Sequence, residues 1–500
     1  MLGAHIGSPA ALVADLTIAT IAGMVSQDMQ VSLVDENISP VNFEIDADFI
    51  GITGRVSQHN RMITIADEFR RRGKTVIIGG PFATLCPDMV RAHCDILVRG
   101  EIEEISNVLF EDLRTGSWKA EYIGGRPDLS ETAMPRWDLY ENDRALIGSI
   151  QTSRGCPFEC EFCDTIQYVG RRQRFKPVPA IIKELDQLYQ HGYRVVFIAD
   201  DNFTASRSRA RKVLSALGAW NRQQKSGSVS FATQVSIDAA KDGELLQMCA
   251  DAGLAYVFIG IETPNEDSLR DSKKRQNLSM DLTVQIARFV EKGIAVMAGM
   301  IVGFDSDGPD IFDRQYAFAS SLPVPMFSLG ALVAPAATPL YDRMQSEGRL
   351  LKGEAAIASM TPWDTNIIPK LMKRREMLKG IRNLSERLYT PAAFAERVVQ
   401  FIRNAPVNSE HAFGREHGTI EQFTGRSVEM DSVRLLSFLR RNSRDQKEMW
   451  NIIRKELHKK PGVSLVVLTM LLQYMQARYM MDSIEIDKNG VSTAVIPEVR

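Results

Sequence analysis

The sequence predicts an α/β protein built from a Rossmann-like layer, a partial (β/α)6 barrel and a mainly helical C-terminal region. Through the first 345 residues, short β-branched runs alternate with helix-length amphipathic segments, which is typical of parallel sheets. Beyond that point, helical periodicity replaces the alternation. We place the divisions at 1–120 for the Rossmann-like layer, 121–146 for a linker, 147–345 for the barrel and 346–500 for the helical region.

The composition is that of an ordinary globular protein. The 500 residues carry a formal net charge of -2 and 44% of them are hydrophobic, so the chain can bury more than one core and offers no overall basic surface for nucleic acid. Three of the six cysteines lie in one short loop, which favours a metal or redox site in a reducing compartment over a disulfide framework. We therefore expect a cytoplasmic protein without a nucleic-acid partner.

Two apolar segments are too short or too interrupted to suggest membrane insertion. Near the start, Asp15 breaks the segment "PAALVADLTIATIAGM", which indicates a buried helix instead of a signal peptide. Near the end, the run "VSLVVLTMLLQYM" from Val463 falls short of the roughly 18 to 20 residues that a spanning helix needs. We expect no transmembrane segment, and for the second run we favour a packed core helix over an interfacial helix.

The first predicted layer contains four strand candidates with helical patterns between them. A segment such as "SQHNRMITIADEFRRRG" carries the helical period, and the βαβ rhythm predicts an open parallel sheet. The stretch "GGRPDLSETAMPRWDLY" is rich in proline, glycine and polar residues and indicates the linker. The strand candidates are "QVSLV", "DFIGIT", "TVIIGG" and "DILVRG".

Six apolar strand candidates between Ile147 and Tyr341 predict the partial barrel, because each is followed by a helix-length segment. In such barrels the functional loops lie at the carboxyl ends of the strands. The C-terminal region has helical patterns and one hairpin candidate, "SIEIDKNGVSTAVI", with Asn489 and Gly490 at its turn. The six strand candidates are "IGSIQTS", "RVVFIAD", "VSFATQV", "YVFIGIE", "IAVMAGMIVGF" and "MFSLGALVA".

The segment "TSRGCPFECEFCDT", directly after the first barrel strand, holds Cys156, Cys160 and Cys163 with the spacing C-x3-C-x2-C. A structural zinc site is normally closed by four protein ligands in two separated pairs, and the sequence has no second pair. Three thiolates can instead bind three irons of a four-iron four-sulfur cluster and leave the fourth iron open to a substrate or cofactor. The spacing therefore predicts a catalytic iron–sulfur site.

This loop, on this barrel, resembles the radical S-adenosylmethionine superfamily, whose signature is C-x3-C-x-aromatic-C, with Phe162 at the aromatic position. The resemblance implies a four-iron four-sulfur cluster held by the three cysteines, with S-adenosylmethionine chelated to the open iron. It also implies an external electron donor, such as flavodoxin or ferredoxin, and reductive cleavage of the sulfonium to a 5′-deoxyadenosyl radical.

The resemblance further places S-adenosylmethionine contacts at the ends of the next four barrel strands. The polar run after the second strand would bind the methionyl amino group, and residues of the third strand would contact the ribose or the carboxylate. Glu262 closes the fourth strand and would bind the ribose or the amine, while Gly303 would let the adenine approach the backbone. A solvated strand end for the third strand and a plain cap for Glu262 are the alternative interpretations. The contacts implied are Phe162, Asp200, Asp201, Asn202, Gln234, Ser236, Glu262 and Gly303.

A second resemblance covers the N-terminal layer, which looks like the cobalamin-binding domain that precedes the barrel in one large class of the superfamily. In that class the strand-end loops hold the corrin, and the Gly79-Gly80-Pro81 turn would let the backbone approach it. Two features depart from the class: its usual first strand is missing or eroded, and Phe82 replaces a histidine. A Rossmann-like scaffold without a ligand is the alternative. The cobalamin contacts implied are Thr53, Ser57, Gly79, Gly80, Pro81, Gly100 and Glu101.

Together the two cofactors imply methyl transfer to an unactivated carbon of a small or lipid-like substrate. The segment "LYTPAAFAERV" and the length of the C-terminal region are similar to hopanoid C-2 methylase-type proteins of the same class. One alternative keeps the radical step without methyl transfer, giving a rearrangement, cyclisation or oxidation. Another is a non-catalytic sensor that binds a corrin or a cluster, which the intact cysteine motif argues against. Methylthiolation of RNA or protein is disfavoured, because the N-terminal layer lacks a three-cysteine set.

Overall fold

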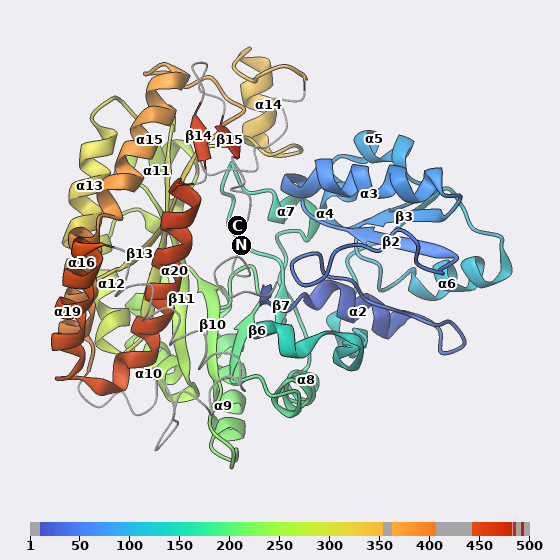
Figure 1. The fold of residues 1–500 in the computed structure, drawn as a ribbon, viewed down its shortest axis with the longest axis horizontal. Coiled ribbons are helices and arrows are strands. Elements are labelled where there is room, and N and C mark those ends of the chain that lie inside the picture. Colours follow the sequence, from blue (N-terminus) through green and yellow to red (C-terminus); the bar gives the residue numbers. More distant parts are fainter. Residues whose placement is uncertain (1–10, 354–362, 407–442, 483, 487–491, 495–500) are drawn as a thin grey trace.

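The computed structural model describes residues 11–353, 363–406, 443–482, 484–486 and 492–494. Figure 1 shows a small α/β layer lying beside a larger curved sheet, and helices cover the outer face of that sheet. Three helices from the C-terminal part of the chain, α15 (Arg374–Leu388), α16 (Pro391–Asn404) and α19 (Arg444–Leu457), lie on the side of the larger sheet that is remote from the small layer. The α/β class and the three-part architecture predicted from the sequence are confirmed.

The larger sheet has seven parallel strands among the described residues, in the order β1-β6-β9-β10-β11-β12-β13. Six of them are the strands predicted for the partial barrel, and they follow one another across the sheet in chain order. Parallel neighbours need a crossover, which helices provide here. The strands are β1 (Ala11–Val13), β6 (Ala145–Ile150), β9 (Val195–Ile198), β10 (Ser230–Val235), β11 (Leu254–Glu262), β12 (Ala295–Val302) and β13 (Met326–Ala331).

Helices cover the outer face of the large sheet and bury its apolar side chains. In β11, for example, Val257, Ile259 and Ile261 are fully buried. Two of the covering helices begin at aspartate N-caps, Asp242 and Asp281, whose carboxylates accept backbone amide hydrogens of the first turn. The covering helices are α8 (Val178–Gln190), α9 (Arg207–Asn221), α10 (Gly243–Ala252), α12 (Leu282–Glu291) and α13 (Ile311–Ser321).

Strand β1 belongs to the large sheet, although the sequence prediction assigned residues 1–120 to the first layer. Its Val13 pairs in parallel with Ile147 of β6. A strand of three residues carries little sequence signal, and it forms here because β6 offers it a free edge to pair with. After β1 the chain enters α2 (Leu16–Met24), which starts at the N-cap Asp15, and then builds the small layer.

The small layer contains a four-stranded parallel sheet in the order β2-β3-β4-β5. Three of these strands were predicted. The predicted strand "QVSLV" was wrong, since that run pairs with no strand, and the fourth strand comes from the segment predicted as a linker. Because the strands are parallel, their carboxyl ends meet at one edge. The elements are β2 (Phe49–Thr53), α3 (His59–Arg71), β3 (Thr75–Gly79), α4 (Gly80–Leu85), α5 (Pro87–Val90), β4 (Ile96–Arg99), α6 (Ser106–Thr115) and β5 (Glu121–Ile123).

The C-terminal helices pack on the β13 side of the large sheet (Figure 1). The hydroxyl of Tyr389 donates to the carbonyl of Phe327 in β13 at 2.6 Å and accepts from the amide of the same residue at 2.9 Å. Arg397 is buried nearby, and its guanidinium donates to the carbonyls of Leu388 and Pro325 at 2.7 and 3.2 Å. These bonds fix the helical region to the barrel. Its first helices are α14 (Pro339–Ser346), α15 (Arg374–Leu388), α16 (Pro391–Asn404) and α19 (Arg444–Leu457).

Helix α20 (Ser464–Asp482) is the core helix predicted from the apolar run near the end, with Val467 and Met470 fully buried. Within the described parts of the chain, no helix has the length and apolar character needed to cross a bilayer. The predicted hairpin is confirmed as β14 (Ile484–Ile486) and β15 (Ser492–Ala494), which pair antiparallel. The residues of its turn lie outside the described part of the chain.

Candidate active site

The three cysteines of the predicted motif share one loop near the carboxyl end of β6. The loop begins after β7 (Ser153–Arg154) and is closed by β8 (Arg174–Phe175), which pairs antiparallel with β7. Gly155 starts it with a φ of 100°, and a Cβ there would lie 2.5 Å from the carbonyl oxygen of Arg172. Only glycine tolerates both conditions. The loop, which we call the cluster loop (residues 155–164), carries Cys156, Cys160 and Cys163.

The thiols of the cluster loop are sheltered from solvent. Cys160 is buried, and the other two are half-buried. Burial raises the pKa of Cys163 to about 11 and also raises the pKa of Cys156, so a strongly attracting cation such as iron is needed to make them thiolates. The described residues contain no group of three His, Cys, Asp or Glu side chains arranged to share one metal ion. Three thiols on one loop suit a cluster that takes three protein ligands better than a zinc ion, which normally takes four.

Lys274 places a buried positive charge beside the cluster loop. Its Nζ donates to Oε1 of Glu262 at 2.6 Å and lies 6.0 Å from the centroid of the Phe162 ring. Burial alone would lower the pKa of Lys274, but the carboxylate of Glu262 and the nearby thiols of Cys160 and Cys163 raise it above its ordinary value. The ammonium group therefore stays charged where a substrate carboxylate next to the cluster would meet it.

Lys274 was not among the predicted residues, whereas its partner Glu262 was. Glu262 is buried and adopts a positive φ of 68°, at an irregularity in the pairing of β11 with β12. The loop after it contains three adjacent cations, Lys273, Lys274 and Arg275. Only the fold distinguishes the middle one, because its neighbours on both sides are exposed.

The polar residues at the end of β9 form hydrogen bonds with the segment that begins the cluster loop. The carboxylate of Asp200 is buried and accepts four hydrogen bonds, from the amides and hydroxyls of Thr152 and Ser153, at 2.5 to 3.0 Å. Asp201 accepts a hydrogen bond from the amide of Gly155 at 2.7 Å, and burial raises its pKa to about 6. Both oxygens of Asp200 thus hold the start of the loop, while at Asp201 only Oδ2 accepts a hydrogen bond from the described residues.

The other predicted S-adenosylmethionine contacts differ in exposure. Asn202 is buried, and its Oδ1 lies 3.4 Å from the hydroxyl of Thr204. Gln234 is exposed near the end of β10, and Ser236 is buried just beyond it. Gln234 is therefore the freer of the two to meet a ligand at the strand ends.

Gly303 follows β12 with a φ of 113°, and a Cβ there would lie 2.5 Å from Sδ of Met377 in α15. The buried carboxylate of Asp307 holds the turn, accepting from the amides of Gly303 and Phe304 at 2.9 and 3.1 Å and from the hydroxyl of Ser268 at 2.7 Å. The glycine was predicted to admit an adenine. In the structure, the φ of 113° favours glycine at this position, which also lies close to Met377 of the C-terminal region.

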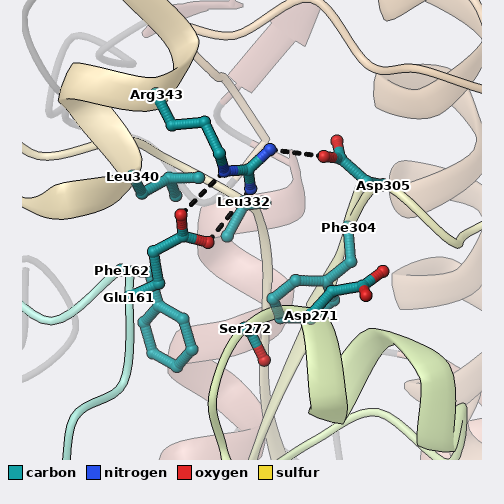
Figure 2. Close-up of a pocket in the computed structure, with 9 residues that line it drawn as sticks. All are labelled: Glu161, Phe162, Asp271, Ser272, Phe304, Asp305, Leu332, Leu340 and Arg343. Atoms are coloured by element: carbon teal, nitrogen blue, oxygen red, sulfur yellow. Dashed lines mark hydrogen bonds and ion pairs between the residues drawn. The ribbon is translucent and has the colours of Figure 1, made fainter.

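A small hollow, partly open to solvent, lies beside Phe162. Figure 2 shows its apolar side chains next to a guanidinium held between two carboxylates. The Phe162 and Phe304 rings pack with centroids 6.1 Å apart, so the hollow reaches from the cluster loop to the end of β12. Its apolar lining consists of Phe162, Phe304, Leu332 and Leu340.

The residues predicted to contact cobalamin gather at the carboxyl edge of the small sheet. Gly80 has a φ of 85°, and a Cβ there would lie 2.3 Å from Oγ1 of Thr53. Gly100 has a φ of 75°, and its Cβ would lie 2.2 Å from the carbonyl oxygen of Gly124. Gly79 differs, because a Cβ there would meet only Val98, at an ordinary 3.5 Å. The strand-end residues are Thr53, Ser57, Gly79, Gly80, Pro81 and Gly100.

This edge faces the cluster loop. Helix α4, which starts at Gly80, contacts α7 (Thr165–Tyr168), which begins two residues after Cys163. Figure 1 shows α4 and α7 lying side by side between the small layer and the large sheet. The two predicted cofactor sites are therefore neighbours in space.

Glu101, also predicted to contact cobalamin, forms ion pairs across the boundary between the two sheets. Its carboxylate accepts from Nη1 of Arg154 at 2.6 Å and from Nη2 of Arg174 at 2.5 Å, and Glu103 also pairs with Arg154 at 2.6 Å. The four side chains are at most 16% exposed. Arg154 and Arg174 belong to the strands that frame the cluster loop, so this ion-pair group fixes the small layer to that loop.

Replacing Glu101 with alanine should loosen the boundary between the two sheets, because the buried guanidinium of Arg174 loses its carboxylate and that of Arg154 keeps only Glu103. The expected cost is about 3 to 5 kcal/mol. We expect a lower urea midpoint and faster hydrogen–deuterium exchange in the peptide covering residues 96–104. Glu121→Gln, which alters a more exposed ion pair with Arg91 and Arg99, serves as the control and should cost about 0 to 1 kcal/mol. Equal effects of the two variants would contradict the role of Glu101.

Comparisons with known proteins place these sites in a family context. Residues 150–314 match the radical SAM superfamily, and residues 338–485 match a domain of unknown function, DUF4070. An uncharacterised methyltransferase of Synechocystis sp. is 37% identical over 346 residues, covering 68% of this chain and 64% of the relative. The hopanoid C-2 methylase of Rhodopseudomonas palustris is 29% identical over 400 residues, covering 78% of this chain and 74% of the relative. This chain thus spans slightly less than two thirds of the first relative.

Two solved structures share the fold. The cobalamin-dependent S-adenosylmethionine radical enzyme OxsB, with aqua-cobalamin bound, has a TM-score of 0.59 at 16% identity, covering 97% of this chain and 80% of OxsB. The radical S-adenosylmethionine methyltransferase TsrM of Kitasatospora setae, with cobalamin and a [4Fe-4S] cluster bound, has a TM-score of 0.53 at 16% identity, covering 83% and 90% of the two chains. The likeness supports the arrangement of a small layer beside a barrel sheet.

Proposed function

This chain belongs to the radical S-adenosylmethionine superfamily, and we propose that it uses cobalamin to transfer a methyl group to an unactivated carbon of a small or lipid-like substrate. The observation that carries the proposal is the contact of α4 with α7, which sets the carboxyl edge of the small sheet against the cluster loop. A substrate between the two cofactors would then face both. When bound, the cluster with S-adenosylmethionine supplies one-electron chemistry and cobalamin supplies a transferable methyl group.

The residues of the barrel suit their proposed tasks. Cys156, Cys160 and Cys163 would hold the iron cluster, and the buried ammonium of Lys274 would bind the carboxylate of S-adenosylmethionine. Glu262 orients that ammonium through its 2.6 Å hydrogen bond and could share the methionyl amine. Buried walls around the cysteines keep water away from the reacting atoms.

The carboxyl edge of the small sheet is suited to bind a large flat ligand. The residues at its strand ends are small, and at Gly79 the fold leaves room that an added side chain would fill. We place cobalamin there, against Thr53, Ser57, Gly79, Gly80, Pro81 and Gly100. The electron donor would be a flavodoxin or ferredoxin, and the reducing cytoplasm would preserve the thiols.

A radical reaction without methyl transfer is the second candidate. It is favoured by one observation: the positive φ values of Gly80 and Gly100, with the close approach of Thr53 and Gly124, explain the glycines at these positions without a ligand. In that case the small layer would act as a scaffold or a platform for the substrate.

The two candidates separate in one experiment. The protein is reconstituted without oxygen with iron, sulfide and hydroxocobalamin, then desalted, and its ultraviolet–visible spectrum is recorded. Methyl transfer predicts about one corrin per chain beside the cluster absorbance. Cluster absorbance without retained corrin supports the second candidate.

A matched pair of glycine variants locates the corrin. Gly79→Val should lose most of the retained corrin while keeping its cluster, because its side chain would enter the space assigned to the ligand, and an added Cβ there meets Val98 only at an ordinary contact distance of 3.5 Å. Gly51→Ala, inside β2 with open space around it, should retain both. Full corrin retention by Gly79→Val would show that the corrin does not bind at this edge of the small sheet.

A further inference from the structure

We infer that Arg343, on the first helix of the C-terminal region, is a positioning residue for the iron cluster, which it serves by holding Glu161 of the cluster loop and balancing its charge. This inference rests on the cluster assigned to the three cysteines under the proposed function. It does not depend on cobalamin or on methyl transfer.

Glu161 occupies a sensitive place, since it lies between Cys160 and Phe162. Its side chain is only 8% exposed. Its amide donates to the carbonyl of Ser272 at 3.0 Å, and its own carbonyl accepts from the amide of Leu340 at 3.2 Å. The backbone between two cluster ligands is therefore held from both sides by segments far away in the sequence.

Arg343 completes this attachment. Its Nε and Nη2 donate to the two carboxylate oxygens of Glu161 at 2.7 and 3.0 Å, a bidentate arrangement that fixes the carboxylate in direction as well as distance. Figure 2 shows the guanidinium lying between Glu161 and Asp305. Leu340 and Arg343 are three residues apart on α14, so one helix face meets both the backbone and the side chain of Glu161.

Asp305 extends the group to the end of β12. It accepts from Nη1 of Arg343 at 2.5 Å and pairs with Nη2 of Arg349 at 2.6 Å. Arg349 also pairs with Glu347 at 2.8 Å. Three carboxylates thus share two guanidinium groups, and of these two guanidinium groups it is that of Arg343 that reaches the cluster loop.

The charge balance matters to the cluster because reduction adds a negative charge to it. With Arg343 in place, the buried carboxylate of Glu161 is neutralised next to the cluster ligands. Without Arg343, that carboxylate would oppose the incoming electron in a region of low dielectric constant, and the reduction potential would fall. The C-terminal region would then influence how readily the cluster accepts the electron that cleaves S-adenosylmethionine.

The test separates the effect of the charges of Glu161 and Arg343 on the cluster from the effect of their packing. The full-length protein is reconstituted with iron and sulfide, and the midpoint potential of the cluster is measured by a redox titration followed by electron paramagnetic resonance. Arg343→Met should shift the midpoint to a more negative value, and Glu161→Gln should shift it the other way. The double variant Glu161→Gln/Arg343→Met removes both charges and should return close to the wild-type midpoint.

Arg343→Lys keeps the charge and should preserve the midpoint, whereas the exposed Arg314→Met, on α13, is the control that should change nothing. A wild-type midpoint in Arg343→Met with a full complement of iron overturns the inference. If Arg343→Met binds less iron, the double variant must regain it, and continued loss in the double variant also overturns the inference. Failure of the wild-type protein to form a cluster at all would instead contradict the proposed function.

Discussion

Cys163→Ala is expected to leave no measurable cleavage of S-adenosylmethionine. Three thiolates are the minimum that hold three irons of the cluster and leave the fourth open, and the remaining cysteines cannot substitute for a missing one. Cys86, Cys94 and Cys249 are buried in other parts of the fold. The measurement is the amount of 5′-deoxyadenosine formed in an anaerobic assay with dithionite as reductant.

The control for this loss is Cys94→Ala, which removes a buried thiol from the core of the small layer. It should bind a full cluster and cleave S-adenosylmethionine at close to the wild-type rate. Unchanged cleavage in Cys163→Ala, with iron still bound, would falsify the assignment of the cluster to this loop.

Lys274→Met is expected to weaken binding of S-adenosylmethionine by about 30-fold or more. Removing one partner of a buried, hydrogen-bonded charge pair costs about 2 to 5 kcal/mol, and the upper part of this range includes the unpaired partner that is left behind. Here that partner would be the carboxylate of S-adenosylmethionine, and Glu262, which is buried and bonded to Nζ at 2.6 Å, holds the ammonium in place for it. The measurement is the dissociation constant of S-adenosylmethionine for the reconstituted protein, taken by equilibrium dialysis without oxygen.

Lys273→Met makes the same chemical change one residue away, on an exposed side chain. It should leave the dissociation constant within about twofold of wild type, since surface substitutions of this kind change little. Lys274→Arg keeps the charge and should recover part of the affinity. Equal affinities for Lys274→Met and Lys273→Met would show that the ammonium does not meet the cofactor.

The parts of the fold that the sequence predicted are those with strong local patterns. The six barrel strands are apolar runs separated by amphipathic helices, and each of them forms. Strand β1 escaped prediction because its three residues are held by the edge of β6, and "QVSLV" misled because a β-branched run without a partner strand forms no sheet. Pairing partners come from tertiary context, which a local pattern does not contain.

The same division holds at the site. Spacing alone predicted the three cysteines as cluster ligands, because a cluster ligand set has a fixed local signature. The roles of Glu101 and Lys274 depended on distant segments: Glu101 lies 53 residues from Arg154 along the chain, and Lys274 follows Glu262 by 12 residues through a loop. A charged side chain at a strand end indicates a polar site. The residue with which it pairs is determined by the tertiary structure.

The position of β1 has a consequence for the architecture of the whole chain. Because β1 pairs with β6, the segment from α2 to β5 leaves one strand of the large sheet and returns to the neighbouring strand. The small layer is thus a folded insertion between two adjacent strands, attached at two points that lie side by side. A chain shortened to begin near residue 121 would lose an outer strand and bare the hydrogen-bonding groups of β6 to other molecules. Trimming the protein to its barrel should therefore produce aggregates, and any graft of this layer onto another barrel would have to carry both of its attachments.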